Sequence, residues 1–382
     1  MGFHEFSSPY DWSRIAAYKR TAKAAFGGMI DLSVGSPVDP VPDSVRKALA
    51  VAANDPNAYG YPATAGTADL RAAIAEWFSA ARNVDLQAIH ADVVPTVGSK
   101  EGVALMASLL HFGEDDVVVQ PKVSYPTYEI GTQLAGAQVL KVDDVADVAS
   151  WCNVPGVKAV WVNSPCNPTG EVYSAERMAG IVAAAREIGA VVLSDECYAL
   201  MQWRGATNSA DDDPLQSTPC ALRSDVCAGS AEGVLVLYSL SKQSNMAGYR
   251  TAFIAGDESL IASMSAYRRQ IGQIIPGPVQ AAMAAGLRDL ESVKVQHARY
   301  RERLGVLVSA LRAYGYCTDM PDGALYVWVR AKSGDCWTDM EQLAKIGIIA
   351  SPGEFYGAPE CLRFSATASD EAIASAAERL VR

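Results

Sequence analysis

One lysine of the chain has neighbours that suit chemistry better than packing. Lys242 lies in the segment SLSKQSNMAGYR, directly after an apolar run that ends at Leu237. Because such a run predicts a strand, the lysine would stand at the carboxyl edge of a sheet, where open α/β sheets bind ligands. An amine in that place can attack an aldehyde. The hydroxyls of Ser239 and Ser241 and the guanidinium of Arg250 are groups that hold a phosphate, although an ordinary polar surface turn would have the same composition.

A carboxylate ends a second apolar run, in the segment AVVLSDECY. Asp195 would be largely desolvated at that position and would need a cationic partner. A pyridinium N–H is such a partner, and the pairing would keep a pyridine ring protonated, so that the ring accepts the electrons of a carbanion. The alternative is an aspartate that caps the next turn. Tyr198, three residues on, either bonds a phenolic oxygen of the same ring or simply packs.

Two turns add further polar groups. Asn167 lies in NSPCNPTG, where two prolines force an extended path after a strand. Its amide either donates to the same phenolic oxygen or serves a structural turn. Gly98 and Ser99, in TVGSKEG and followed by Lys100, would present backbone N–H groups at the start of a helix, which is an anion site. The spacing is not that of a Walker A loop, and no G-x-G-x-x-G follows a strand, so a dinucleotide cofactor has no support.

The bulk composition excludes several classes of partner. The 382 residues carry a formal charge of −11, so the surface should repel nucleic acid and anionic lipid. The eight cysteines include no C-x-x-C pair, and the four histidines do not cluster with them. This argues against a metal site or a disulfide framework and favours a cytoplasmic location. No apolar run approaches the ~18 residues of a membrane span, and the N-terminus lacks the pattern of a signal peptide.

The elements that must position these residues follow from the apolar pattern. Between about 90 and 256 the chain alternates short apolar runs with helical patterns such as Gly102–Leu110 and Ala175–Ile188, the latter with Ser174 as a plausible N-cap. This predicts an α/β domain with a mostly parallel sheet that is buried on both faces. The predicted strands are Val93–Val97, Val117–Gln120, Val139–Val142, Val157–Asn163, Ala190–Ser194, Val234–Ser239 and Ala252–Ala255.

The pattern of apolar residues changes after Pro278. Helical sequence runs to Tyr314 with a break near Asp289, and a strand, a helix, a strand and a last helix follow, which predicts a smaller α+β domain. We therefore divide the chain into an N-terminal segment (1–45) that packs with the small domain, a large domain (46–285) and a small C-terminal domain (286–382). Residues 205–233 should form a long surface loop that contains the acidic triplet Asp211–Asp213.

Together and in this order, the motifs resemble those of the class I/II (fold type I) pyridoxal-phosphate aminotransferases, and the likeness covers essentially the whole chain. It implies a large domain with a mostly parallel sheet flanked by helices, a smaller α+β domain, and pyridoxal 5′-phosphate held by Lys242 as a Schiff base. Lys242 would also move the proton of the reaction. Asp195 would pair with the pyridine nitrogen, and Asn167 and Tyr198 would bond the phenolic oxygen.

The same resemblance implies further contacts. Tyr125 aligns with the residue that stacks on the ring, and Tyr61 aligns with the tyrosine that reaches the phosphate of a neighbouring subunit, which implies a homodimer with shared active sites. Arg363 aligns with the arginine that grips the α-carboxylate of the substrate, and Gly35 and Asn167 would line the substrate pocket. The remaining cofactor contacts implied are Gly98, Ser99, Lys100, Ser239, Ser241 and Arg250.

Within that family the segments YDWSRIAAYKRTA, LSVGSPVDPVP and SYPTYEIGTQLAGA look like the bacterial succinyldiaminopimelate aminotransferases of lysine biosynthesis. This implies ping-pong amino transfer from N-succinyl-LL-2,6-diaminopimelate to 2-oxoglutarate. The alternatives are an aminotransferase for aspartate, kynurenine or an aromatic amino acid, and a C–S β-lyase on the same scaffold. A departure from the family is Gln243, where a basic residue is common. The candidate cations for the distal carboxylates are Arg14, Lys19, Arg20, Arg268 and Arg269.

Overall fold

The centre of the molecule is a seven-stranded sheet, seen in a computed structural model that describes residues 11–203 and 218–382. The strand order is β2-β8-β7-β6-β5-β3-β4, and only β8 runs antiparallel to its neighbours. The prediction of a mostly parallel sheet is therefore confirmed. The bounds are β2 Ala91–Val97, β3 Val117–Pro121, β4 Gln138–Val142, β5 Val157–Asn163, β6 Val191–Asp195, β7 Val234–Ser239 and β8 Thr251–Asp257.

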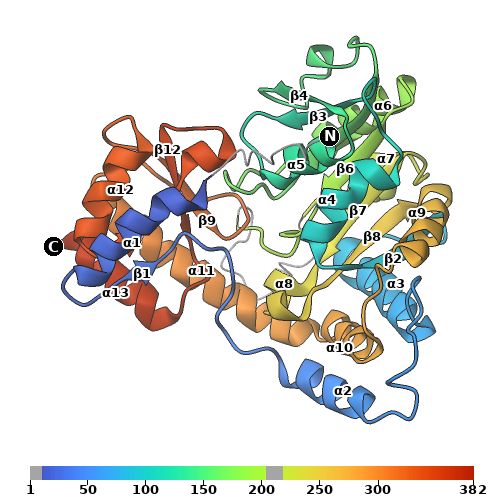
Figure 1. The fold of residues 1–382 in the computed structure, drawn as a ribbon, viewed down its shortest axis with the longest axis horizontal. Helices are drawn as coiled ribbons and strands as arrows, with labels where there is room; N and C mark the ends of the chain where they lie inside the picture. Colours follow the sequence, from blue (N-terminus) through green and yellow to red (C-terminus); the bar gives the residue numbers. More distant parts are fainter. Residues whose placement is uncertain (1–10, 204–217) are drawn as a thin grey trace, which may run out of the picture.

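Helices cover both faces of this sheet (Figure 1). Alternate residues of the central strands point to opposite faces, so that Val192 and Val236 join one core cluster while Leu193 and Leu235 join another. The first cluster includes side chains from α3 (Ala68–Arg82), α6 (Ala175–Glu187) and α10 (Gly277–Arg288). The second includes side chains from α4 (Ser99–Leu109), α5 (Thr127–Leu134) and α9 (Glu258–Gln270). This double burial explains why the strands read as continuous apolar runs.

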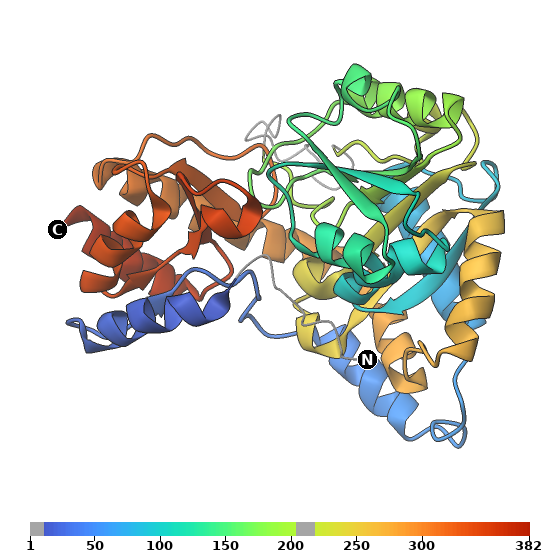
Figure 2. The ribbon, with the colours of Figure 1, turned by 45° about the horizontal axis from the view of Figure 1, so that its top comes forward.

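A smaller layered unit lies beside the large sheet (Figures 1 and 2). Its three-stranded antiparallel sheet has the order β11-β12-β9. Asp289 lies between α10 and α11 and caps α11 by accepting from the Ser292 N–H, which explains the predicted break. The bounds are β9 Tyr326–Arg330, β11 Ser351–Pro352, β12 Cys361–Ser365, α11 Leu290–Ala313, α12 Cys336–Lys345 and α13 Asp370–Val381.

The N-terminal segment joins this smaller unit. The strand β1 (Ile30–Asp31) pairs in parallel with β10 (Ile348–Ile349), and the helix α1 (Ile15–Ala24) contacts α12. The helix α2 (Asp43–Ala53) packs instead on α10 of the large unit. The division of the chain at residues 45 and 285 stays a prediction. In the described ranges 11–203 and 218–382, no helix is long and apolar enough to cross a membrane.

The expectation of a surface loop over 205–233 is wrong for its second part. Residues 204–217, which include the triplet Asp211–Asp213, lie outside the described residues. Thr218 and the run Cys220–Leu222 are buried, and the short helix α7 (Ser224–Cys227) follows. The cause is a buried ion pair between Arg82 and Glu196, which binds this backbone: Arg82 donates to the carbonyl of Pro219, and Glu196 accepts from the N–H of Ala221. The polar composition of residues 205–233 did not indicate this contact with residues that are far away in the sequence.

Candidate functional site

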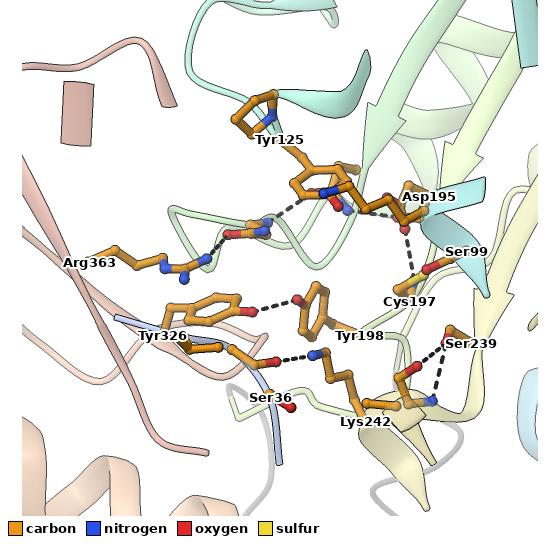
Figure 3. A pocket seen from close by; sticks show the side chains of 18 of the residues that line it. Ser36, Ser99, Tyr125, Asp195, Cys197, Tyr198, Ser239, Lys242, Tyr326 and Arg363 are labelled. Carbon is orange, nitrogen blue, oxygen red and sulfur yellow. Dashed lines mark hydrogen bonds between the residues drawn. The ribbon is translucent and has the colours of Figure 1, made fainter. Parts of the chain in front are cut away.

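A pocket opens at the carboxyl ends of the parallel strands, between the large sheet and the smaller unit (Figure 3). It collects most of the residues that the sequence motifs had singled out. Those that line it are Gly35, Ser99, Lys100, Tyr125, Asn167, Asp195, Tyr198, Ser239, Ser241, Lys242, Arg250 and Arg363. Gly98 directly precedes this lining, at the N-cap of α4. The arrangement arises because parallel strands end at one edge of the sheet, so that the loops that follow them meet there.

Lys242 is positioned by a strand that turns at once into a short helix. The helix α8 (Leu240–Gln243) follows β7, and the Ser239 hydroxyl at its N-cap accepts from the N–H of Ser241. The Lys242 ammonium donates to the carbonyl oxygen of Gly35. Burial lowers the pKa of Lys242 to about 8, and the charges of Arg363 and Arg250 act in the same direction. The amine therefore has a substantial neutral, nucleophilic fraction near neutral pH.

Gln243, the departure noted in the sequence, has a structural explanation. Its side chain is 1% exposed and accepts a hydrogen bond from the Tyr238 hydroxyl at 2.7 Å. Its amide donates to the carbonyl of Gly286 at 3.1 Å and to the hydroxyl of Ser244 at 3.0 Å. These bonds satisfy the buried amide, and the side chain does not line the pocket. A glutamine at this position therefore helps to hold α8 in place and does not change the charge of the pocket.

Asp195 ends β6 with its carboxylate 6% exposed. Its Oδ2 accepts from the Tyr128 hydroxyl at 2.8 Å, and its Oδ1 accepts from the N–H of Cys197 at 3.1 Å. Burial raises the pKa of Asp195, while hydrogen bonds from the Cys197 side chain, the Tyr128 hydroxyl and the Cys197 backbone N–H act to lower it. Among the residues that the structure describes, no lysine, arginine or histidine forms an ion pair with this carboxylate. A buried carboxylate without a protein cation suits a cationic ligand group.

Backbone and guanidinium groups form a cradle near Ser239. Gly98 has a positive φ of 76°, and a Cβ there would overlap the guanidinium of Arg250. The positive φ favours glycine at this position, and a side chain there would also displace the guanidinium. Arg250 donates to the carbonyl of Ala247 at 3.0 Å, and it has no acidic partner within the described ranges. With the hydroxyls of Ser239 and Ser241 hydrogen-bonded to each other at 2.7 Å and the N-terminus of α4 alongside, this corner suits a phosphate.

Arg363 faces this cradle from β12 of the smaller unit. It is 4% exposed, and it donates to Oδ1 of Asn167 and to the carbonyl of Ser33, both at 2.7 Å. Among the residues that the structure describes, its buried Nε–H has no hydrogen-bond partner, and no carboxylate pairs with the guanidinium. The guanidinium carbon lies 4.0 Å from the ring centroid of Tyr326. A buried guanidinium with a spare donor suits the carboxylate of a ligand.

Two tyrosines contact each other across the pocket (Figure 3). The hydroxyls of Tyr198 and Tyr326 lie 2.6 Å apart. Burial, together with the nearby Tyr326, raises the pKa of Tyr198 well above its ordinary value, so it stays a neutral phenol. A Cβ at Gly35 would collide with the Tyr326 hydroxyl, which explains the glycine at that position. Sequence reasoning missed Tyr326 and Tyr128 because their partners are 128 and 67 residues away.

Other predicted residues lie outside the pocket of the single chain. Tyr61 is fully exposed, at 103%. None of the five candidate cations for a distal carboxylate lines the pocket. Arg268 is buried in an ion pair with Glu101 at 2.9 Å, so it is excluded, and Lys19 pairs with Asp31 at 2.8 Å. Further lining residues, to which the sequence had given no individual role, are Trp12, Ser33, Val34, Ser36, Pro126, Asn163, Cys197, Ala247, Tyr326, Phe355 and Tyr356.

Arg14 contacts the pocket wall indirectly. It donates to Glu354 at 2.6 Å, and its guanidinium lies 4.0 Å from the ring centroid of Trp337. Trp12, two residues before it, contacts the ring of Phe355 at 4.9 Å, and both aromatic rings line the pocket. Arg14 therefore lies beside the pocket wall that the N-terminal segment and the short helix Gly353–Tyr356 form.

The donor set fits pyridoxal 5′-phosphate group by group. Asp195 would hold the ring nitrogen, the cradle around Gly98, Ser99 and Arg250 would hold the phosphate, and the Lys242 amine would meet the aldehyde. Two observations support this fit: the buried carboxylate of Asp195 forms no ion pair with any residue that the structure describes, and the backbone at Gly98, with a positive φ, lies against the Arg250 guanidinium. Tyr125 lines the same pocket.

Comparisons with known proteins agree with this geometry. Residues 27–380 match the family described as aminotransferase class I and II. The chain is 40% identical over 373 residues, 97% of this chain and 98% of the relative, to a 4-dedimethylamino-4-oxo-anhydrotetracycline transaminase of Streptomyces rimosus. It is 29% identical to an LL-diaminopimelate aminotransferase of Syntrophobacter fumaroxidans, over 97% of this chain and 95% of the relative. It also resembles the structure of a probable N-succinyldiaminopimelate aminotransferase from Thermus thermophilus, with a TM-score of 0.82, 28% identity, and coverage of 97% and 99%.

Proposed function

The chain belongs to the class I and II aminotransferases, and on that premise we propose that it transfers the amino group of N-succinyl-LL-2,6-diaminopimelate to 2-oxoglutarate. The family works with pyridoxal 5′-phosphate as cofactor. The observation that carries the assignment of this pocket is that Lys242, with its lowered pKa, lines it together with Asp195 and Arg363. Both of these residues are buried, and neither forms an ion pair within the ranges that the structure describes. Such a site is prepared for a zwitterionic substrate and a cofactor with a basic ring.

The roles of the individual residues follow from their charges. When bound, pyridoxal 5′-phosphate supplies an aldehyde and a ring that accepts electrons from the substrate Cα. Lys242 would hold the aldehyde and, once displaced by the substrate amine, would act as general base and then general acid for the Cα proton. Arg363 would bind the α-carboxylate and fix the orientation of that proton. Asp195 would keep the ring nitrogen protonated, and the neutral Tyr198 phenol would donate to the phenolic oxygen.

The choice of substrate rests on likeness and on one feature of the pocket wall. The segments quoted above and the resemblance to the Thermus structure favour a succinylated diaminopimelate. Both ends of that substrate are anionic, so a second cation is needed beyond Arg363. We assign this role to Arg14, because it lies beside the aromatic wall of Trp12 and Phe355 and is half exposed. It would exchange its contact with Glu354 for the distal carboxylate.

We further propose a homodimer in which Tyr61 completes the phosphate site of the partner subunit. In the single chain Tyr61 and Tyr59 are 103% and 90% exposed, although large aromatic side chains are usually at least partly covered. The phosphate cradle also has exposed groups, Arg250 and Lys100, on its outer side. A second copy of the chain would cover the aromatic rings and bring a hydroxyl donor to the cradle.

A panel of donors and acceptors with the cofactor-loaded protein tests the proposal. We expect kcat/KM for succinyldiaminopimelate with 2-oxoglutarate to exceed the values for LL-diaminopimelate, aspartate, alanine, kynurenine and aromatic amino acids. If kcat/KM for any of these compounds is tenfold higher, a difference of about 1.4 kcal/mol, the proposed substrate is wrong. The proposal of amino transfer would still stand. Release of pyruvate from a cysteine conjugate in place of amino transfer would favour the C–S β-lyase.

A further inference from the structure

Tyr128 contacts the carboxylate of Asp195 from outside the pocket. It lies on α5, is 1% exposed and does not line the pocket. Its hydroxyl donates to Oδ2 of Asp195 at 2.8 Å. Its ring stacks on Trp161 of β5, with centroids 4.4 Å apart and planes 16° from parallel. A buried tyrosine that is fixed by stacking and gives its only O–H to one carboxylate restricts the orientation of that carboxylate.

Asp195 is therefore held from two sides. The N–H of Cys197 fixes Oδ1, and the phenol of Tyr128 fixes Oδ2. The nearby acid Glu196 is neutralised by Arg82 at 2.9 Å, so it does not compete for these donors. Burial, reinforced by the charge of Asp195, raises the pKa of Tyr128 well above its ordinary value, so the hydroxyl stays a donor. The Cys197 side chain also hydrogen-bonds to this carboxylate, and Asp195 lines the pocket in which the cofactor ring would lie.

We propose that Tyr128 is a positioning residue that holds the carboxylate of Asp195 in place and makes it a weaker base, so that the proton shared with the cofactor ring stays on the ring nitrogen. This inference rests on the assignment of Asp195 to the ring nitrogen. The physical reason is that a hydrogen bond given to a carboxylate stabilises its charged form. Without the phenol, the carboxylate would hold the shared proton more strongly and could rotate away from the ring.

The test is Tyr128→Phe, which keeps the stacking on Trp161 and removes only the hydroxyl. A matched control exists in the smaller unit: the Tyr316 hydroxyl donates to Oδ2 of the buried Asp339, also at 2.8 Å, away from the pocket. Tyr316→Phe removes the same kind of bond and reports its general cost in thermal stability. Both variants are measured with the whole chain and without substrate, so the identity of the amino donor does not affect the result.

Two readouts separate positioning from packing. The first is the affinity of the apoprotein for pyridoxal 5′-phosphate, which we expect to fall roughly tenfold in Tyr128→Phe and to stay unchanged in Tyr316→Phe. The second is the ¹⁵N chemical shift of a ring-labelled cofactor, which should move toward that of an unprotonated pyridine in Tyr128→Phe alone. A wild-type affinity and an unchanged shift, with stability loss like that of the control, would overturn the inference.

A double variant guards against indirect effects. If Tyr128 acts through Asp195, then adding Tyr128→Phe to Asp195→Asn should change neither the cofactor affinity nor the ¹⁵N shift any further. Additive losses would show that the phenol acts by another route and would also overturn the inference. If Asp195→Asn alone leaves the ¹⁵N shift of the ring nitrogen unchanged, the assignment of Asp195 to that nitrogen is refuted, so the two failures are distinguishable.

Discussion

The guanidinium of Arg363 donates to Oδ1 of Asn167 across 2.7 Å, although the two residues are 196 positions apart. This bond fixes the orientation of the Asn167 side-chain amide. Because Oδ1 accepts from the arginine, the Nδ2 group is left to donate toward the pocket. The backbone N–H of Asn167 donates in turn to Oδ1 of Asn163 at the end of β5. The residue expected to bind the substrate carboxylate therefore also orients a residue expected to bind the cofactor.

Replacing Arg363 by lysine keeps the charge but removes the planar set of donors. We expect kcat/KM for an α-amino acid to fall about 30- to 100-fold, which corresponds to a loss of ~2–3 kcal/mol for a hydrogen bond between charged groups. Steady-state kinetics checks this, with a primary amine that lacks the α-carboxylate as the control donor. An equal loss for both donors would contradict the assigned role.

The amine of Lys242 should react at lower pH than ordinary lysines. Its pKa of about 8 lies below the ordinary lysine value, so its neutral fraction grows as pH rises through 8. We expect labelling of the apoprotein by an amine reagent to show a midpoint near 8 at Lys242, and borohydride reduction of the loaded protein to fix the cofactor on the same residue. Arg250→Gln should raise that midpoint, because one of the charges that lowers the pKa is removed. Attachment to a different lysine would refute the assignment.

Gly98→Ala should damage the phosphate corner. The added Cβ would overlap the Arg250 guanidinium, and the φ of 76° disfavours any residue but glycine. We expect the affinity for pyridoxal 5′-phosphate to fall at least about tenfold, equivalent to ~1.4 kcal/mol, as measured by equilibrium titration of the apoprotein. Gly180→Ala, on α6 with no atom near the added Cβ, is the matched control and should bind normally. Equal affinities for the two variants would show that the cradle is not the phosphate site.

Arg14→Gln tests the distal contact. A charge-assisted contact at a half-exposed site contributes about 1–1.5 kcal/mol, so KM for succinyldiaminopimelate should rise about tenfold while that for alanine changes little. The control is Lys19→Gln, which removes a partly exposed cation of α1 that pairs with Asp31 at 2.8 Å. This variant should leave KM for both substrates unchanged. An unchanged KM in the Arg14 variant would move the distal site to another group.

Subunit mixing tests the shared site. Tyr61→Phe and Lys242→Ala should each be impaired as homodimers when the cofactor is limiting, whereas a hybrid dimer has one site without either lesion. We expect mixing to restore close to a quarter of the wild-type activity per total site, because about half the dimers are hybrids and each has one intact site, on statistical exchange. Absence of recovery, with exchange confirmed by mass, would exclude the contribution of Tyr61 to the partner.

The sequence by itself determined the cofactor chemistry and the fold class. Asp195 ends an apolar run, Lys242 and Asn167 lie a few residues after the ends of two others, and the carboxyl ends of parallel strands meet at one edge. Local order along the chain therefore predicted that these side chains converge. The resemblance to known enzymes then gave their roles, and the family comparison confirmed the class of enzyme.

Only the tertiary structure decided which distant side chains support those residues. Tyr128 meets Asp195, Tyr326 meets Tyr198, and Arg82 anchors a buried segment near Ala221 that had been expected on the surface. An apolar or amphipathic pattern tells which face of a helix or strand is buried, but it does not tell which partner that face meets. The partner depends on how helices and sheets pack, and that packing joins residues separated by many tens of positions in the chain.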